Sequence, residues 1–169
     1  MKPKTKGKYT PNLDAFSNRK DVVYVITRFN AIEGRLAEIL IKEIGAPEEK
    51  QAFLRDILFN SAILPFAAKV KLFLHLRVKK NWPKIDREVF RRLMEIRNQF
   101  AHSERSLEIT VELLRERGKI SSGRHVGNKM MLSSVTGSGE LEKVDVADAL
   151  AEFTQRWEVL SEYFTKLQR

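Results

Sequence analysis

The feature that most constrains the fold is a long apolar stripe with helical spacing near the N-terminus. Between Asp21 and the sequence Gly45-Ala46-Pro47, apolar residues recur three, four or seven positions apart, at Val22, Ile26, Phe29, Leu36 and Leu40. This spacing puts them on one face of an α-helix, and a Gly-Ala-Pro sequence is typical of a helix end. The folded part of the chain therefore starts with a long helix whose apolar stripe must pack against other elements.

Further segments show the same periodicity, at about residues 47–60, 65–76, 83–102 and 144–168, and Asp145 is the expected cap of the last one. Residues 107–111 and 129–135 instead read as two short strands around a Gly/Ser/Arg loop, which predicts a small hairpin in an insertion of residues 107–139. The expected fold class is mainly α: a bundle of four to five helices with a small β-hairpin insertion before the last helix. Residues 1–12 are expected to be a flexible basic arm, and residues 13–169 a single helical domain.

The charge of the chain is uneven and points to an anionic partner. The net charge is +9 and the pI about 9.9. Residues 140–169 carry seven acids and four bases, a net charge of −3, so the first 139 residues hold +12. Because a basic domain attracts polyanions by releasing their counterions, RNA or another polyanion is the leading partner class.

Composition excludes several classes of function. The chain has no cysteine, which removes disulfide scaffolds, thiolate metal sites and cysteine nucleophiles. No apolar run approaches the length of ~20 residues that a membrane span needs, and no signal peptide is recognisable, so a cytoplasmic protein without membrane contact is expected. The histidines, at 75, 102 and 125, lack metal-ligand spacing, and no glycine-rich phosphate loop occurs. We expect no metal and no cofactor.

The helix expected at residues 83–102 carries a polar line opposite its core stripe. Arg87, Arg91, Asn98 and His102 fall close to this line. Asn98 and His102 are four residues apart, so the amide and the imidazole can meet. The two arginines are candidate nucleic-acid-binding residues, leading toward a polar site at the end of the helix.

Arg97 points away from this line, toward apolar positions, and its guanidinium should be partly buried. Glu33 lies in the middle of the apolar face of the first helix, where an unpaired carboxylate is expensive. We therefore predict a structural ion pair between Glu33 and Arg97. A second apolar strip on Arg97's helix, formed by Phe90, Met94 and Ala101, is a candidate self-association surface.

The sequence Arg97-Asn98-Gln99-Phe100-Ala101-His102 resembles the motif of the HEPN superfamily, an arginine followed after four to six residues by a histidine. Residues 20–103 also resemble the mannitol operon repressor-like branch of HEPN-type proteins, in the long first helix with Glu33, the segment Pro65 to Leu76, and the Arg…His helix. Residues 107–139 and the basic arm have no counterpart in either resemblance.

The resemblance implies a HEPN-like dimer in which Arg97 and His102 of both subunits line one cleft, a metal-independent endoribonuclease site in catalytic members. The catalytic candidates are Arg97, Asn98 and His102. In this chemistry a histidine moves protons near neutral pH, and an arginine and an amide hold the phosphate. The alternative is a non-enzymatic, mannitol repressor-like transcriptional regulator or protein-binding module, in which Arg97 and His102 are structural and His102 caps carbonyls at the helix end.

Overall fold

The computed structural model of the chain describes residues 20–116, 119–135 and 140–167, and the expected basic arm lies outside them. Its first element is α1 (Lys20–Ile44), which confirms the long N-terminal helix. The helix ends at Gly45, whose φ of 69° is a left-handed conformation that glycine adopts without steric cost. One face of α1 is buried along its whole length, at Val25, Phe29, Ile32, Leu36, Ala37, Ile39, Leu40 and Ile41.

The other long helices, α3 (Phe66–Lys79), α4 (Arg87–His102) and α5 (Val146–Leu167), pack against α1. Phe73 of α3 is fully buried at the centre, with ring contacts to Trp82, Phe90, Tyr163 and Phe164. Phe90 is thus a core residue, and its expected place in a second apolar surface strip is wrong. Asp86 caps α4 by accepting a hydrogen bond from the Glu88 amide at 2.9 Å, so this helix begins later than residue 83.

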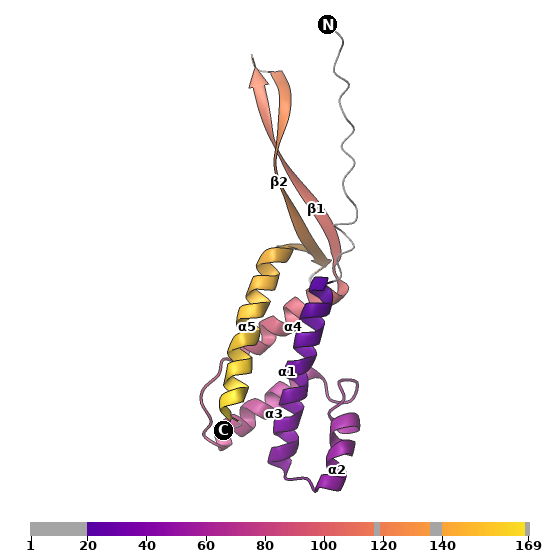
Figure 1. Cartoon of the computed structure of the whole chain (residues 1–169), viewed down its shortest axis with the longest axis vertical. Helices are drawn as coiled ribbons and strands as arrows, with labels where there is room; N and C mark the ends of the chain where they lie inside the picture. The colour runs from indigo at the N-terminus through magenta and orange to yellow at the C-terminus, as the bar shows by residue number, and fades with distance from the viewer. Residues whose placement is uncertain (1–19, 117–118, 136–139, 168–169) are drawn as a thin grey trace.

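A short helical segment lies at the other side of α1. It consists of α2 (Glu48–Phe53), continued by a π-helical turn, η2 (Leu54–Leu58), as expected for a helix near residues 47–60. The segment buries few of its apolar side chains: Phe59 anchors it in the core, whereas Phe53, Ile57 and Leu58 are exposed. In Figure 1 the segment lies beside the end of α1 that is farthest from the hairpin.

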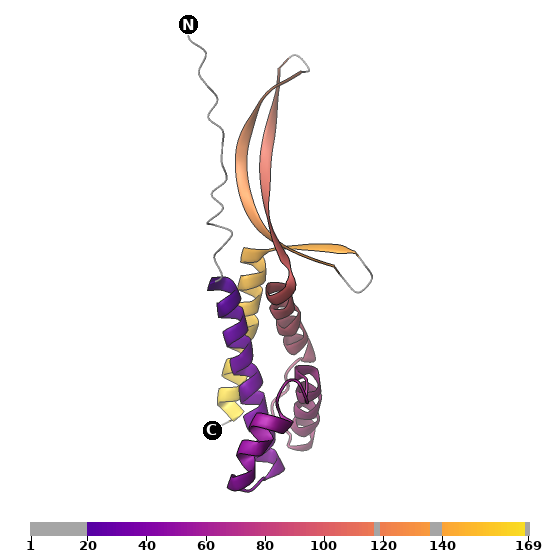
Figure 2. The same cartoon turned by 90° about the vertical axis from the view of Figure 1, so that its right-hand side faces the viewer.

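The expected hairpin is present and is much longer than its sequence signal. Strands β1 (Glu104–Glu116) and β2 (Lys119–Val135) are antiparallel, and β3 (Leu141–Asp145) pairs with the base of β2, in the order β1-β2-β3. The residues expected to form a loop, including Gly123 and Gly127, belong to β2 and lie near two register irregularities. The hairpin projects from the end of the bundle opposite α2 and curves away from it (Figures 1 and 2).

The base of the sheet is tied to the bundle. Leu132 of β2 is buried where β2 packs against α4 and α5. Asp145, the last residue of β3, caps α5 by accepting a hydrogen bond from the Ala147 amide at 2.8 Å, as the sequence predicted. The fold is therefore a mainly α bundle with a small antiparallel sheet inserted before the last helix, which confirms the expected class. None of the described helices is both long and apolar enough to cross a membrane.

Candidate functional site

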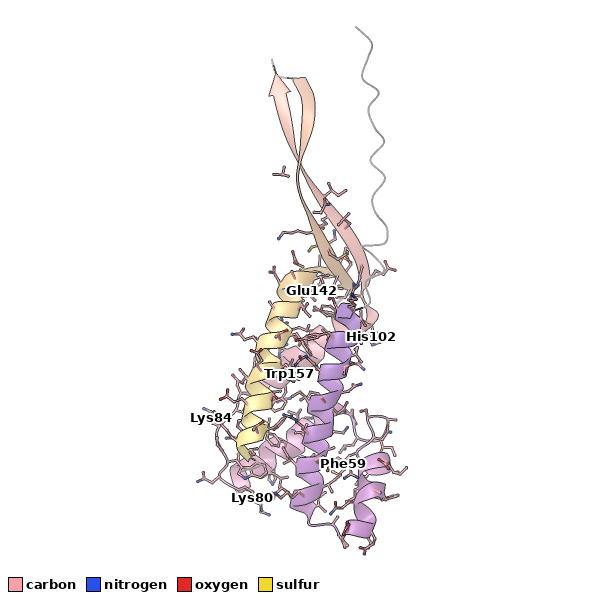
Figure 3. All side chains as sticks on the ribbon, viewed as in Figure 1. Phe59, Lys80, Lys84, His102, Glu142 and Trp157 are labelled. Carbon is pink, nitrogen blue, oxygen red and sulfur yellow. The ribbon has the colours of Figure 1, made fainter. Side chains whose placement is uncertain are left out.

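The candidate site lies on the C-terminal half of α4. The buried face of this helix determines which residues point to solvent. Leu93, Ile96 and Phe100 are buried in the core, and this fixes the rotation of the helix. The opposite face turns Asn98 and His102 to solvent, as expected. His102 is the last residue of α4, at the end of the bundle from which the hairpin projects (Figure 3).

Arg97 is partly buried and lies next to Asn98. One guanidinium nitrogen, Nη1, donates to Oδ1 of Asn98 at 3.0 Å, and the guanidinium carbon lies 5.7 Å from the centre of the Phe29 ring. The Nε atom of Arg97 is buried and has no hydrogen-bond partner among the described residues. Leaving such a buried donor unpaired is costly, and no described residue uses this hydrogen-bonding capacity of Arg97.

The predicted ion pair between Glu33 and Arg97 is wrong. Oε1 of Glu33 accepts hydrogen bonds from Nζ of Lys69 at 2.7 Å and from Oγ of Ser61 at 2.7 Å. The Lys69 side chain is only 1% exposed and that of Glu33 15%. The carboxylate does lie in an apolar face and does have a cationic partner, but the partner comes from α3.

The sequence contains a signal for this pair. Lys69 lies three residues after Phe66 and four before Phe73, so it shares the buried face of α3 with them. A lysine at such a position needs a counter-charge, and Glu33, 15% exposed, is an acid within the apolar face of the neighbouring helix α1.

Arg97, Asn98 and Glu33 line one surface pocket of about 240 Å³ between α1, α4 and the segment before α3. Its lining combines polar and apolar side chains: Phe29, Asn30, Glu33, Ser61, Pro65, Phe66, Met94, Arg97 and Asn98. Because Lys69 and the Ser61 hydroxyl both donate to Glu33, the donors that the pocket presents are the guanidinium of Arg97 and the amides of Asn30 and Asn98. This donor set suits a phosphate oxygen.

His102 is not among the residues that line this pocket. It lies one helical turn beyond Asn98 on the exposed side of α4, where residues four apart are neighbours. The structure therefore brings Arg97 and Asn98 together and places His102 beside them, open to solvent.

The two arginines expected to bind nucleic acid, Arg87 and Arg91, differ in their ion pairing. Arg91 is held by two carboxylates of its own helix, Glu88 and Glu95, and the hydrogen bond that it donates to Glu88 is the largest factor that raises its pKa. Arg87 is exposed and makes no ion pair with a described residue. The expected basic line is thus partly neutralised. The acids responsible are spaced three and four residues from Arg91, a pattern readable in the sequence.

Positive charge is also neutralised between α4 and α5. Arg92 donates two hydrogen bonds to Glu152, at 3.0 and 2.7 Å, and Arg156 donates to the same carboxylate at 2.8 Å. These hydrogen bonds, first the one from Arg92, lower the pKa of Glu152 to about 2. This face of the bundle is an ion-pair network and offers little free positive charge.

No group of three or more described histidine, aspartate and glutamate side chains is arranged to hold a metal ion. No protein-family model matches the sequence, and neither a curated protein nor a solved structure resembles the chain significantly.

Proposed function

We propose that this protein is an RNA-binding, HEPN-like endoribonuclease that acts as a homodimer and needs no metal, with its site at Arg97, Asn98 and His102. One observation carries the proposal: a partly buried arginine with an unsatisfied donor shares a pocket with an asparagine, and an exposed histidine lies one turn away. These are the groups that hold a phosphate and move a proton.

The proposed reaction uses the 2′-hydroxyl of the RNA as the nucleophile. One His102 removes the hydroxyl proton as the 2′ oxygen attacks the adjacent phosphorus. The bond from phosphorus to the 5′ oxygen then breaks, and a second His102, from the partner subunit, protonates that oxygen. The products are a 2′,3′-cyclic phosphate and a 5′-hydroxyl, so no water or metal takes part in this step.

The roles of the other two residues follow from their contacts. Arg97 stabilises the negative charge that grows on the phosphate oxygens, and its hydrogen bond to Asn98 fixes the direction of the guanidinium. A donor that stabilises such developing charge contributes about 10²–10³-fold to the rate. Arg87, the exposed arginine at the start of α4, supports the RNA strand outside the site.

A second candidate is a regulator or protein-binding module without catalysis. The specific observation in its favour is the ion-pair network at Glu88, Arg91, Glu95, Arg92 and Glu152, which removes much of the positive surface that RNA would need near the site.

The test is RNA cleavage in EDTA by the wild type, by His102→Ala and by a matched control, His75→Ala. His75 is also an exposed histidine, on α3, and its loss removes the same functional group elsewhere. We expect the wild type and His75→Ala to cleave equally and His102→Ala to lose at least ~100-fold in rate. Equal cleavage by all three proteins, or none by a folded wild type that still binds RNA, would reject the catalytic proposal in favour of binding.

A further inference from the structure

A second pocket lies beside the candidate site and shares two of its lining residues. It is formed by α1, η2, the loop that follows η2 and the start of α3, and its volume is about 480 Å³. Glu33 and Ser61 line both this pocket and the pocket of Arg97. Phe59, another lining residue, lies between α1 and the α2 segment (Figure 3). A volume of this size suits a small-molecule ligand, and we call this space the α1 pocket.

Lys69, which lines the α1 pocket, has more hydrogen-bond donors than partners. Its side chain is only 1% exposed, and Nζ makes one hydrogen bond, to Oε1 of Glu33 at 2.7 Å. An ammonium group carries three N–H donors, so two of them have no partner among the described residues. Leaving buried donors without an acceptor costs free energy. A ligand oxygen in the α1 pocket would satisfy them.

Two further lining residues keep unused donors. Oδ1 of Asn60 accepts a hydrogen bond from the Ala62 amide at 3.0 Å, which fixes the orientation of the side chain and leaves both N–H groups of Nδ2 free. Arg55 holds Glu38 through Nε and Nη2, so Nη1 has no partner among the described residues. The pocket is therefore lined by donors from η2, the loop after it and α3.

The acids of the α1 pocket are neutralised within its own lining. Glu33 pairs with Lys69 and Glu38 with Arg55. Arg35, the remaining charged lining residue, donates to Oγ of Ser161 at 3.1 Å and has no acidic partner among the described residues. The lining thus carries a net charge of +1, from three bases and two acids. Such a pocket favours an anionic ligand.

Gly34 is an independent sign that something occupies the α1 pocket. It lies in the middle of α1, is exposed and lines this pocket. A glycine inside a helix is less favourable than alanine. A Cβ atom at Gly34 would meet no heavy atom within 4 Å, so packing among the described residues gives no reason for a glycine. A ligand that approaches the α1 backbone closely gives one.

We propose that the α1 pocket binds a nucleotide, with its phosphate group at Lys69, Asn60 and Arg55 and its remaining part over Gly34. Charge-assisted donors on three elements suit a group with three acceptor oxygens, which a phosphate has and a carboxylate lacks. The rest of the lining is apolar, at Ala31, Ala37 and Phe59, and accommodates the nucleoside.

The same phosphate can come from two sources. It belongs either to a free nucleotide or to the neighbouring nucleotide of an RNA strand held at Arg97, because Glu33 and Ser61 line both pockets. Binding in the α1 pocket is an equilibrium property and does not depend on cleavage by His102.

The first test detects the occupant at the pocket itself and uses the absence of native cysteine. Ala31→Cys introduces one thiol at an exposed lining position, and its alkylation rate is measured with AMP, with adenosine or with a 2′-O-methyl RNA oligonucleotide, which the proposed reaction cannot cleave. Val78→Cys, on α3 and outside the pocket at a residue that is 68% exposed, is the control.

We expect AMP to slow alkylation of Ala31→Cys, adenosine to have little effect and Val78→Cys to react at the same rate throughout. Protection by the oligonucleotide at lower concentration than AMP assigns the phosphate to an RNA strand, and protection by AMP alone assigns it to a free nucleotide. Protection by neither, or equal protection by adenosine and AMP, overturns the proposal.

The second test changes the pocket in the Ala31→Cys protein. Asn60→Asp keeps the acceptor for the Ala62 amide and replaces the Nδ2 donors by a negatively charged oxygen. We expect it to raise the AMP concentration needed for half protection about 10-fold or more. Gln155→Glu makes the same change at an exposed position of α5 and should leave this concentration unchanged.

Gly34→Leu fills the space above α1 with a good helix former. We expect it to abolish protection without lowering the thermal midpoint, because its Cβ meets no neighbour. Full protection in Asn60→Asp, or in a folded Gly34→Leu protein, overturns the proposal. A protein that cleaves RNA but shows no protection refutes the α1 pocket alone, whereas protection without cleavage refutes only the catalytic proposal.

Discussion

The buried pair of Lys69 and Glu33 gives the sharpest stability prediction. Replacing Glu33 by Gln leaves the Lys69 ammonium, 1% exposed, without a counter-charge. Replacing Lys69 by Met leaves a carboxylate that is 15% exposed and still accepts a hydrogen bond from Ser61. Removing one partner of a buried pair costs about 3–5 kcal/mol. We expect Glu33→Gln to reach this range and Lys69→Met to fall below it, because water and Ser61 still solvate the remaining charge.

The double variant Glu33→Gln/Lys69→Met separates the pair from its surroundings. Removing both charges together is often neutral, so we expect it to be more stable than Glu33→Gln alone. Urea unfolding of the four proteins measures the free energies, and thermal unfolding should show Glu33→Gln about 6–20 °C below the wild type. A loss below about 1 kcal/mol for Glu33→Gln, or a greater loss for Lys69→Met, would contradict the burial argument.

Further predictions concern the α4–α5 network and the core. Glu152, whose pKa is lowered to about 2 from 4.5, stabilises the fold above pH 4.5, and this contribution, at most about 3 kcal/mol, is lost as the pH falls toward 2. Urea unfolding from pH 6 to 2 should show a shallower decline for Glu152→Gln, and an identical decline would refute the pairing. Phe73→Ala should lower the free energy of unfolding by about 3–5 kcal/mol. Phe53→Ala, at an exposed site, should change monomer stability by less than about 0.5 kcal/mol. Equal losses in urea unfolding would place Phe53 in the core. Asp86→Ala removes the α4 cap and should cost about 1 kcal/mol in the same assay, and no loss would deny the cap a role.

The long helices α1, α4 and α5 were predictable because each has a long periodic face. The stripe of α1 and the acidic cap of α5 at Asp145 are both local signals, and both are confirmed. The hairpin was underestimated because Gly123 and Gly127 read as loop residues, although backbone pairing across a register irregularity tolerates them within a strand.

The candidate site was predicted in part. Helical spacing correctly put Asn98 and His102 on the exposed side of α4. It did not identify the partner of Glu33, because helix spacing says nothing about which neighbouring helix faces a given residue. The burial of Phe90 and the exposure of Phe53 and Ile57 also depend on tertiary packing, which the period of a single segment does not contain.

The measurement that tests the proposed catalysis most directly is the chemistry of the cleaved ends. An RNA that the wild type cleaves in EDTA is compared with the same oligonucleotide carrying a single 2′-deoxy sugar at the cleavage position. Attack by the 2′-hydroxyl predicts a 2′,3′-cyclic phosphate from the first substrate and no cleavage at that position in the second. Cleavage of the deoxy position, or products with 5′-phosphate ends, would contradict the mechanism built on His102.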